Sequence, residues 1–151
     1  MRREFSAGGI VYKRIQDSGS KIQLLWLLRR PKPNKDYRGN LGWSFPKGWI
    51  DTKNQESRIK NQETPEEAAL REVREEGGVE AKIVRKLPTI KIFFKNKGET
   101  VMKFITYFVM EWEKDIPEGH DWETEEVKWV TKGQALEMLA FKNEKELLAA
   151  C

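Results

Sequence analysis

The chain has 151 residues, of which 28 are Lys or Arg and 24 are Asp or Glu, giving a net charge of +4 at pH 7. This length predicts one domain, residues 1–151, with a hydrophobic core of its own. No stretch approaches the roughly twenty apolar residues of a membrane helix, and the single cysteine, Cys151, excludes an intramolecular disulfide, so we expect a cytoplasmic protein without a membrane span.

The first 40 residues predict a β-hairpin followed by a basic loop. Residues 5–13 and 22–28 are rich in Ile, Val and Leu, and the turn-forming segment DSGS lies between them. Residues 29–40 contain two prolines and five basic side chains. Because proline interrupts regular structure, we expect this segment to be a loop.

A strong helix is expected at residues 64–77. Thr64 and Glu67 have the spacing of a capping box, and Pro65 stands in the first turn, where its missing N–H is harmless. Gly77 and Gly78 favour the left-handed conformation that ends a helix.

The remaining residues predict four strands and a broken helical region. The strands are expected at 79–87, 89–95, 100–112 and 125–131, with the turn KNKGE joining the second and third. Residues 132–150 have helical spacing that is interrupted near 141–143. Strands that surround one strong helix and precede a second helical region predict an α/β fold, with one sheet covered on both faces.

The helix at 64–77 concentrates acidic side chains near its end. Glu72, Glu75 and Glu76 project within an arc of about 100°, where like charges weaken an isolated helix. Converging carboxylates are hard oxygen ligands, which suit Mg²⁺ or Mn²⁺ better than Zn²⁺. A bound cation would compensate the repulsion, and the alternative is a solvated acidic surface.

The spacing around these acids resembles the signature of the Nudix hydrolases. The pattern E-x7-R-E-V-x-E-E-x-G-V occupies residues 63–79, with Glu63 first. The family's preceding glycine corresponds to Gly48 in SFPKGWID, but fourteen residues separate it from Glu63 instead of five. The difference is a nine-residue insertion, which we place in a loop within residues 51–62 because added loop length costs little closure entropy. The insertion could displace the Gly48 carbonyl as a metal ligand.

This resemblance implies an αβα sandwich, with a mixed sheet between helices, and a Mg²⁺- or Mn²⁺-dependent hydrolase of nucleoside diphosphates linked to another group. It also implies roles for individual residues. The metal ligands would be Gly48, Glu72, Glu75 and Glu76, and an ion pair between Arg71 and Glu63 would orient them. Glu72 itself, Glu123 or Glu125 could act as the general base.

Less specific segments indicate the substrate. WSFPKG, KFITYFVMEW and the C-terminal stretch resemble the diadenosine tetraphosphate hydrolase branch, which implies cleavage of a dinucleoside polyphosphate to ATP and AMP. In this interpretation Lys47 and Lys103 contact phosphates, while Tyr107 and Phe94 stack on a base. Tyr107 could instead belong to the sheet core, and Phe141 is expected to pack in the core with the last helix.

Other functions remain open from the sequence. Residues 1–60 carry fourteen basic side chains against five acids, and residues 61–151 carry fourteen against nineteen. The basic segment 29–38 would suit an RNA 5′ end or an inositol polyphosphate. RNA 5′ pyrophosphohydrolase, oxidised nucleoside triphosphate pyrophosphatase and diphosphoinositol polyphosphate phosphohydrolase are therefore alternatives. A non-catalytic nucleotide-binding module is an alternative of a different class, and nothing in the sequence indicates the oligomeric state.

Overall fold

The computed structural model describes residues 1–33, 42–51 and 63–151. Most of the predicted basic loop and nearly all of the predicted insertion therefore lie outside the described residues. The helices and strands are β1 Arg2–Gln16, β2 Ile22–Pro31, β3 Lys47–Trp49, α1 Pro65–Gly77, β4 Val79–Lys86, β5 Ile90–Asn96, β6 Glu99–Asp115, β7 Thr124–Val130, α2 Lys132–Met138 and α3 Lys142–Ala149.

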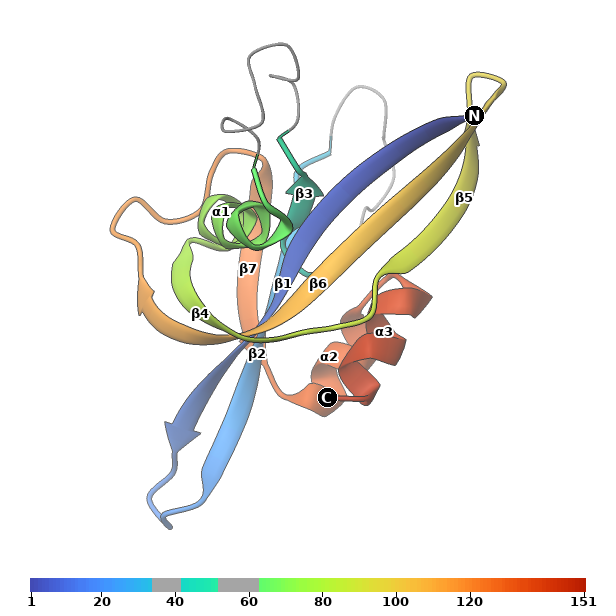
Figure 1. The fold of residues 1–151 in the computed structure, drawn as a ribbon. Helices are drawn as coiled ribbons and strands as arrows, with labels where there is room; N and C mark the ends of the chain where they lie inside the picture. The colour runs from blue at the N-terminus through green and yellow to red at the C-terminus, as the bar shows by residue number, and fades with distance from the viewer. Residues whose placement is uncertain (34–41, 52–62) are drawn as a thin grey trace.

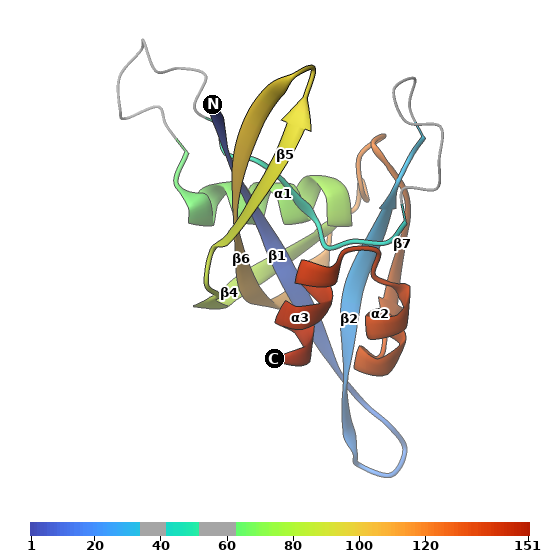
Figure 2. The same ribbon diagram turned by 90° about the vertical axis from the view of Figure 1, so that its right-hand side faces the viewer.

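The strands form one mixed sheet that lies between helices, as predicted (Figure 1). Its main path is β4-β6-β1-β2-β7, with β3 paired to β1 and β5 paired to β6. Strands β1 and β6 are parallel, and the other pairs are antiparallel. Helix α1 covers one face, while α2 and α3 cover the other (Figures 1 and 2).

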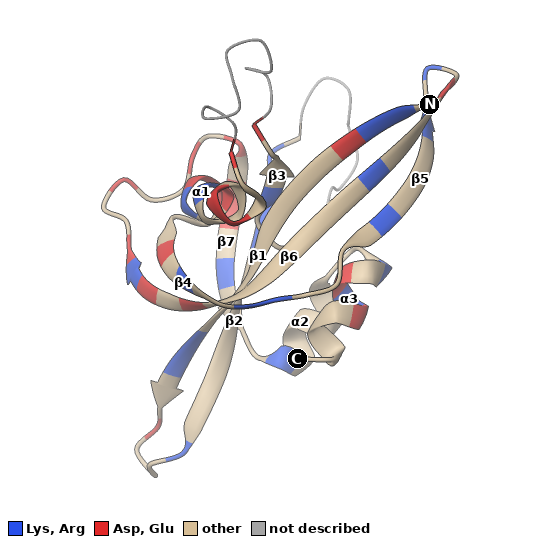
Figure 3. Ribbon diagram, viewed as in Figure 1, with Lys and Arg blue, Asp and Glu red and all other residues tan. Residues whose placement is uncertain are grey.

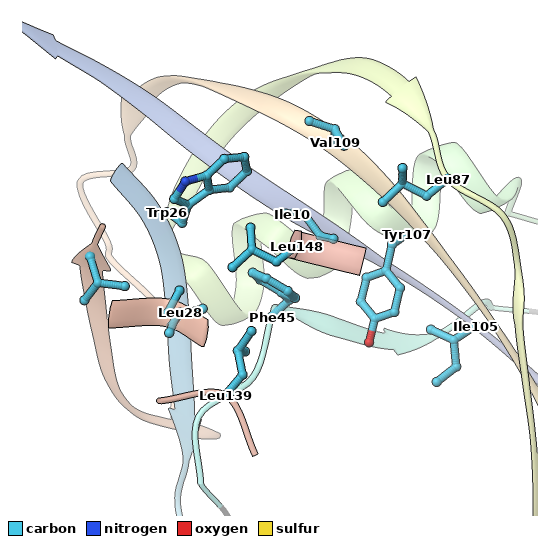
Figure 4. Close-up of a cluster of buried hydrophobic side chains, with 12 residues drawn as sticks. Ile10, Trp26, Leu28, Phe45, Leu87, Ile105, Tyr107, Val109, Leu139 and Leu148 are labelled. Atoms are coloured by element: carbon cyan, nitrogen blue, oxygen red, sulfur yellow. The ribbon is translucent and has the colours of Figure 1, made fainter. Parts of the chain in front are cut away.

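Each helical layer encloses its own hydrophobic cluster. Under α1, Val73 and Ala69 pack against sheet residues such as Phe108 and Met110. Under α2 and α3, a second cluster surrounds Phe45 and Tyr107, whose rings meet edge to face (Figure 4). Alternate residues of β6 face the two clusters because successive side chains of a strand point to opposite faces.

The predicted ends of α1 are confirmed. Thr64 accepts a hydrogen bond from the Glu67 backbone, and the Glu67 carboxylate accepts one from the Thr64 backbone. Gly78 caps the other end in the left-handed region, with φ of 73°. These interactions join residues that are close in sequence. They therefore define where α1 begins and ends, and which residues share its acidic face, independently of tertiary packing.

Several boundaries differ from the predictions, and β1 and β6 are longer than expected, at Arg2–Gln16 and Glu99–Asp115. Strand β2 extends to Pro31, so Arg29 and Arg30 belong to a strand and not to a loop. Pairing with β7 supplies the hydrogen-bonding partners that keep this segment extended. Strand β3 was not predicted, because it has three residues and forms through pairing with the distant β1 and contacts with α1.

The two described ends of the predicted insertion are held together. The Glu63 backbone N–H donates to the Asp51 carbonyl oxygen at 3.2 Å, and the Asp51 N–H donates to Glu63 Oε1 at 2.8 Å. An N–H that bonds to a carbonyl three positions earlier closes a four-residue β-turn. Two linking residues would therefore be enough to join Asp51 to Glu63.

We expect that replacing residues 52–62 by Asn-Gly, a net loss of nine residues, leaves a cooperatively folded protein. Only the connection between the two joined ends changes, and turn-forming residues replace a longer loop. Urea unfolding followed by circular dichroism measures the effect. A variant that joins Asp51 directly to Glu63 should be strongly destabilised, and loss of cooperative unfolding in the Asn-Gly variant would contradict the prediction.

None of the helices in the described ranges is long and apolar enough to cross a membrane.

Candidate active site

Helix α1 places its signature carboxylates along one side of a cleft. Glu72 and Glu76 are buried, whereas the Glu75 side chain is nearly half exposed. Burial of Glu72 follows from the close approach of β3: a Cβ added to Gly48 would lie 2.3–2.5 Å from its carboxyl atoms. A larger residue at position 48 would have to displace the Glu72 carboxyl group, and the backbone of Gly48 lies beside Glu72 despite the insertion.

Arg71 organises the acids around it. Its Nε and Nη2 donate to the two carboxylate oxygens of Glu63, at 2.5 and 2.9 Å. Its Nη1 reaches Glu72 Oε1 at 2.7 Å and Glu75 Oε2 at 3.2 Å. The hydrogen bond from Arg71 lowers the pKa of Glu63, and the same bond raises that of Arg71. The structure thus brings Arg71 and Glu63 together in the bidentate geometry that guanidinium groups favour.

Glu76 is held by different partners. Its Oε1 accepts a hydrogen bond from the Lys47 backbone N–H at 3.0 Å and lies 3.5 Å from Arg29 Nε. Burial raises the pKa of Glu76 to about 7, against the opposing effect of Arg29. Burial also raises the pKa of Glu72, although Arg71 opposes it. Burial is the largest cause of both shifts, because removal from water disfavours the charged form of a carboxyl group.

Arg29 and Thr124 are functional neighbours that the sequence did not reveal. Arg29 is buried, and its Nη2 and Nε donate to Thr124 Oγ1 at 3.0 and 3.2 Å. Thr124 Oγ1 in turn donates to the Glu76 carbonyl oxygen at 2.9 Å. No local pattern marks an arginine as the partner of a glutamate 47 residues later, and only the packing of α1 over β2 brings the two together.

A second acidic segment closes the cleft. The Asp121 N–H donates to the Glu75 carbonyl at 2.7 Å, and Asp121 Oδ1 accepts from the Glu123 N–H at 3.1 Å. Of the two predicted bases in this region, Glu123 lines the cleft, whereas Glu125 is exposed on β7 outside it. Asp121, an acid of the same segment, also lines the cleft.

The cleft, called the acidic pocket below, has a volume of about 960 Å³. Its lining residues are Gly48, Trp49, Ile50, Asp51, Arg71, Glu72, Glu75, Glu76, Asp121 and Glu123. Among the described residues, no three acidic side chains converge closely enough to enclose an ion, because Arg71 holds Glu72 and Glu75. The donors are nevertheless all oxygens with excess negative charge, a set that fits Mg²⁺ or Mn²⁺.

A second pocket of about 420 Å³, called the lysine pocket below, lies on the α3 side of the sheet. All four predicted substrate contacts line it, together with other residues: Lys47, Ile90, Ile92, Phe94, Lys103, Ile105, Tyr107, Phe141, Lys142, Asn143 and Glu144. The sequence separates these residues widely, and β3, β5, β6 and α3 bring them together.

Two aromatic residues differ from the predictions. Tyr107 is only 1% exposed and packs against Phe45, so its ring face cannot stack on a base. Phe141 is 49% exposed rather than packed in the core, because it is the N-cap residue that precedes α3. The exposed rings of the lysine pocket are therefore Phe94 and Phe141.

Hydrogen bonds through Lys47 link Glu144 of the lysine pocket to Glu76 of the acidic pocket. The Glu144 carboxylate is 2% exposed and accepts hydrogen bonds from Phe45 N at 3.2 Å, Lys47 Nζ at 2.9 Å and the Tyr107 hydroxyl. Lys47 thus binds Glu76 through its backbone and Glu144 through its side chain. Burial lowers the pKa of nearby Lys103, and the positive charge of Lys47 lowers it further.

The chain is similar to proteins of one family. The model for the NUDIX domain matches residues 7–151. A putative mutator protein, MutT4 from Mycobacterium tuberculosis, is 33% identical over 144 residues, which cover 95% of this chain. The chain spans about half the length of that relative, 52%.

Solved structures share the fold at low identity. An Ap4A hydrolase binary complex from C. elegans is 20% identical with a TM-score of 0.59, covering 97% of this chain and 93% of that one. A NUDIX hydrolase from Nitrosomonas europaea is 14% identical with a TM-score of 0.68, covering 98% and 87%.

Proposed function

The chain belongs to the Nudix hydrolase family, and we propose that it cleaves a phosphoanhydride bond in a dinucleoside polyphosphate, with Mg²⁺ or Mn²⁺ bound in the acidic pocket. The observation that carries this proposal is the placement of Lys47. This residue joins the acidic pocket to the lysine pocket. Both pockets are bounded by β3, and the proposed phosphate chain passes this strand, with its metal-bound part in the acidic pocket and its base in the lysine pocket.

The proposed metal ligands are Glu72, Glu75, Glu76 and the Gly48 carbonyl. A bound divalent cation would neutralise phosphate charge and lower the pKa of a bound water. Arg71 and Glu63 support the ligands by limiting how Glu72 and Glu75 can turn.

Glu123 is the proposed candidate for a base outside the helix. It lines the acidic pocket, and its backbone N–H is fixed by Asp121 Oδ1. Its negative charge also contributes to the raised pKa of Glu72, which indicates that the two carboxylates are close. Glu72 remains the alternative base.

The proposed substrate is diadenosine tetraphosphate or a similar molecule, cleaved to ATP and AMP. The lysine pocket supports this choice because it combines exposed rings with cations. Phe94 and Phe141 can contact the faces of a purine, while Lys47 and Lys103 can act as point charges for phosphate oxygens. Tyr107 then forms the wall of the pocket and supports Glu144 through its hydroxyl.

A substrate panel with Mg²⁺ tests this function: diadenosine tetraphosphate, nucleoside triphosphates, ADP-ribose, triphosphorylated RNA and diphosphoinositol phosphates. We expect Lys103→Ala to lower kcat/KM for diadenosine tetraphosphate by about tenfold, and that for ADP-ribose much less. The positive charge of Lys103 should stabilise the bound tetraphosphate more than the shorter diphosphate, because more phosphate oxygens can reach it. A charged hydrogen bond contributes about 1.5–3 kcal/mol.

The matched control is Lys82→Ala, which removes an exposed lysine on β4 that lines neither the acidic pocket nor the lysine pocket. It should leave both rates unchanged. Equal losses on the two substrates in Lys103→Ala would contradict a phosphate contact. The substrate assignment would be refuted if the wild-type protein did not hydrolyse dinucleoside polyphosphates but hydrolysed another member of the panel.

A further inference from the structure

Another cavity lies on the face of the sheet that α2 and α3 cover. Its volume is about 640 Å³, and it shares no lining residue with the acidic pocket or the lysine pocket. We call it the β2 pocket, because Ile22, Leu24 and Trp26 of that strand line it together with residues of β1, β4, β6 and α2. Pockets of roughly 300–1,000 Å³ have the size that holds small organic ligands.

Strand β2 gives the pocket an apolar floor. Leu24 and Trp26 lie on the same side of the strand as Leu28, which packs beneath α2 and α3, because alternate residues share a face. Ile22 is 65% exposed and Leu24 is 38% exposed. Figure 3 shows no charged residue along this stretch of β2. Exposed apolar side chains that gather in a hollow mark a surface that a ligand can cover.

A bulge in β4 brings a cation to this floor. Ile83 pairs with Met110, and after the bulge Arg85 pairs with Val109. Paired residues share a face, and Met110 packs beneath α1 whereas Val109 packs beneath α2 and α3. Arg85 therefore stands on the face of the β2 pocket, where a strand without the bulge would direct it toward α1, as it does Ile83.

The positive charge of Arg85 has no acidic partner nearby. Among the described residues, none that lines the β2 pocket is an Asp or a Glu. Lys82 of the same strand lies 4.0 Å from Glu111, whereas Arg85 forms no salt bridge with any residue that the structure describes. An exposed guanidinium beside an apolar wall attracts an anion.

Lys132 adds a second cation at the same end of the pocket. Its Nζ donates to the carbonyl oxygens of Cys151 at 2.7 Å and Ala149 at 3.4 Å. Burial raises the pKa of the Cys151 thiol, and the charges of Arg85 and Lys132 oppose this rise, so both cations lie near Cys151. One end of the β2 pocket is therefore positive, and its floor is apolar.

We propose that the β2 pocket binds a small organic anion with an apolar body, of the medium-chain carboxylate class. The chain would cover Leu24 and Trp26, and the carboxylate would pair with Arg85, whose planar guanidinium can hold both oxygens. A neutral apolar molecule would leave the cation without a partner, and a phosphate ion would leave the floor in contact with water. The proposal does not depend on the hydrolase function, because the pocket lies apart from the proposed metal ligands.

Three probes separate the two parts of this site: octanoate has a chain and a charge, octan-1-ol has the chain alone, and acetate has the charge alone. Backbone amide NMR titrations at constant ionic strength give both the affinity and the location. We expect octanoate to shift the signals of the β2 pocket and to bind at least about tenfold more tightly than either other probe, as one charge-assisted hydrogen bond would provide.

Two variants should affect the probes differently. Arg85→Met should weaken octanoate binding about tenfold and leave octan-1-ol binding unchanged, because it removes the charge alone. Val84→Ser should weaken both, since Val84 also lines the pocket. Both side chains are exposed, so the variants should fold, and their NMR spectra report this directly.

The matched controls are Lys82→Met, which removes another cation of β4, and Phe93→Ser, which removes an exposed apolar side chain of β5. They should bind octanoate like the wild type. Absence of saturable binding, equal affinity for octanoate and octan-1-ol, or octanoate binding that Lys103→Ala abolishes would overturn the proposal. So would a dimer in sedimentation velocity that Val84→Ser dissociates, because a second copy of the chain would then cover the pocket.

Discussion

Replacing Glu76 by Gln is expected to lower Mg²⁺-dependent hydrolysis at least about 100-fold, because it removes one of the proposed negative ligands. Each factor of ten in rate corresponds to about 1.4 kcal/mol of lost transition-state stabilisation. Gln has the size of Glu, so the variant should fold. Steady-state rates on the best substrate of the panel, with and without EDTA, measure the effect.

The same variant should change how stability depends on pH. Burial raises the pKa of Glu76 to about 7 from an ordinary value of 4.5, so the metal-free folded state holds a proton that the unfolded state releases. The contribution of Glu76 to the free energy of unfolding is therefore complete below about pH 4.5. It is lost as the pH rises to about 7, by up to roughly 3 kcal/mol. Urea unfolding in EDTA at pH 5 and pH 8 should show that the free energy of unfolding falls less between the two pH values in Glu76→Gln than in the wild type. At pH 8, added Mg²⁺ should raise the free energy of unfolding of the wild type but not that of Glu76→Gln.

Glu80→Gln is the control, since Glu80 is another glutamate close in sequence but on β4, where it faces Lys114. It should leave both activity and the pH dependence unchanged. Full activity of Glu76→Gln, or of the wild type in EDTA, would contradict the metal-site proposal.

Glu144→Ala is expected to cause the largest loss of stability, about 3–5 kcal/mol. Removing one partner of a buried ion pair leaves the other charge without compensation. Here the variant would leave the Lys47 ammonium, the Phe45 N–H and the Tyr107 hydroxyl without their shared hydrogen-bond acceptor. Glu144→Gln should be less destabilised, because an amide oxygen can still accept hydrogen bonds. Urea unfolding midpoints and slopes measure both.

A double-mutant cycle separates stability from substrate binding. If Glu144 positions Lys47 for phosphate, then Glu144→Gln should raise KM for diadenosine tetraphosphate in the wild type but not in Lys47→Met. Glu146→Gln is the control, because Glu146 is an exposed glutamate of the same helix. Additive effects on KM in the double variant would show that Glu144 serves the fold alone.

The sequence alone determined the features whose interactions are local. The capping box Thr64–Glu67 and the left-handed Gly78 are four-residue and one-residue signals, so helix α1 and its boundaries could be predicted. The fixed spacing of Glu72, Glu75 and Glu76 then placed their carboxylates on one side of the helix. The alternation of strands and helices was likewise sufficient to predict the α/β fold.

Only the tertiary structure decided which distant residues join these carboxylates. Arg29 reaches Glu76 because α1 packs over β2, and Glu123 lines the acidic pocket where Glu125 does not. Glu123 lies in the turn before β7, where its backbone N–H bonds to Asp121, whereas Glu125 lies on the strand itself. Two acids that are two positions apart therefore have different surroundings, which composition cannot distinguish.

The lysine pocket shows the same limit. The sequence named Lys47, Lys103, Tyr107 and Phe94 separately, but it could not show that they share one cavity or that Glu144 joins it. Nor could it separate a buried ring from an exposed one: Tyr107 is enclosed by packing, while Phe141 is left open at the start of α3. Burial depends on contacts between elements far apart in the chain, and these are set only when the sheet and its two helical layers come together.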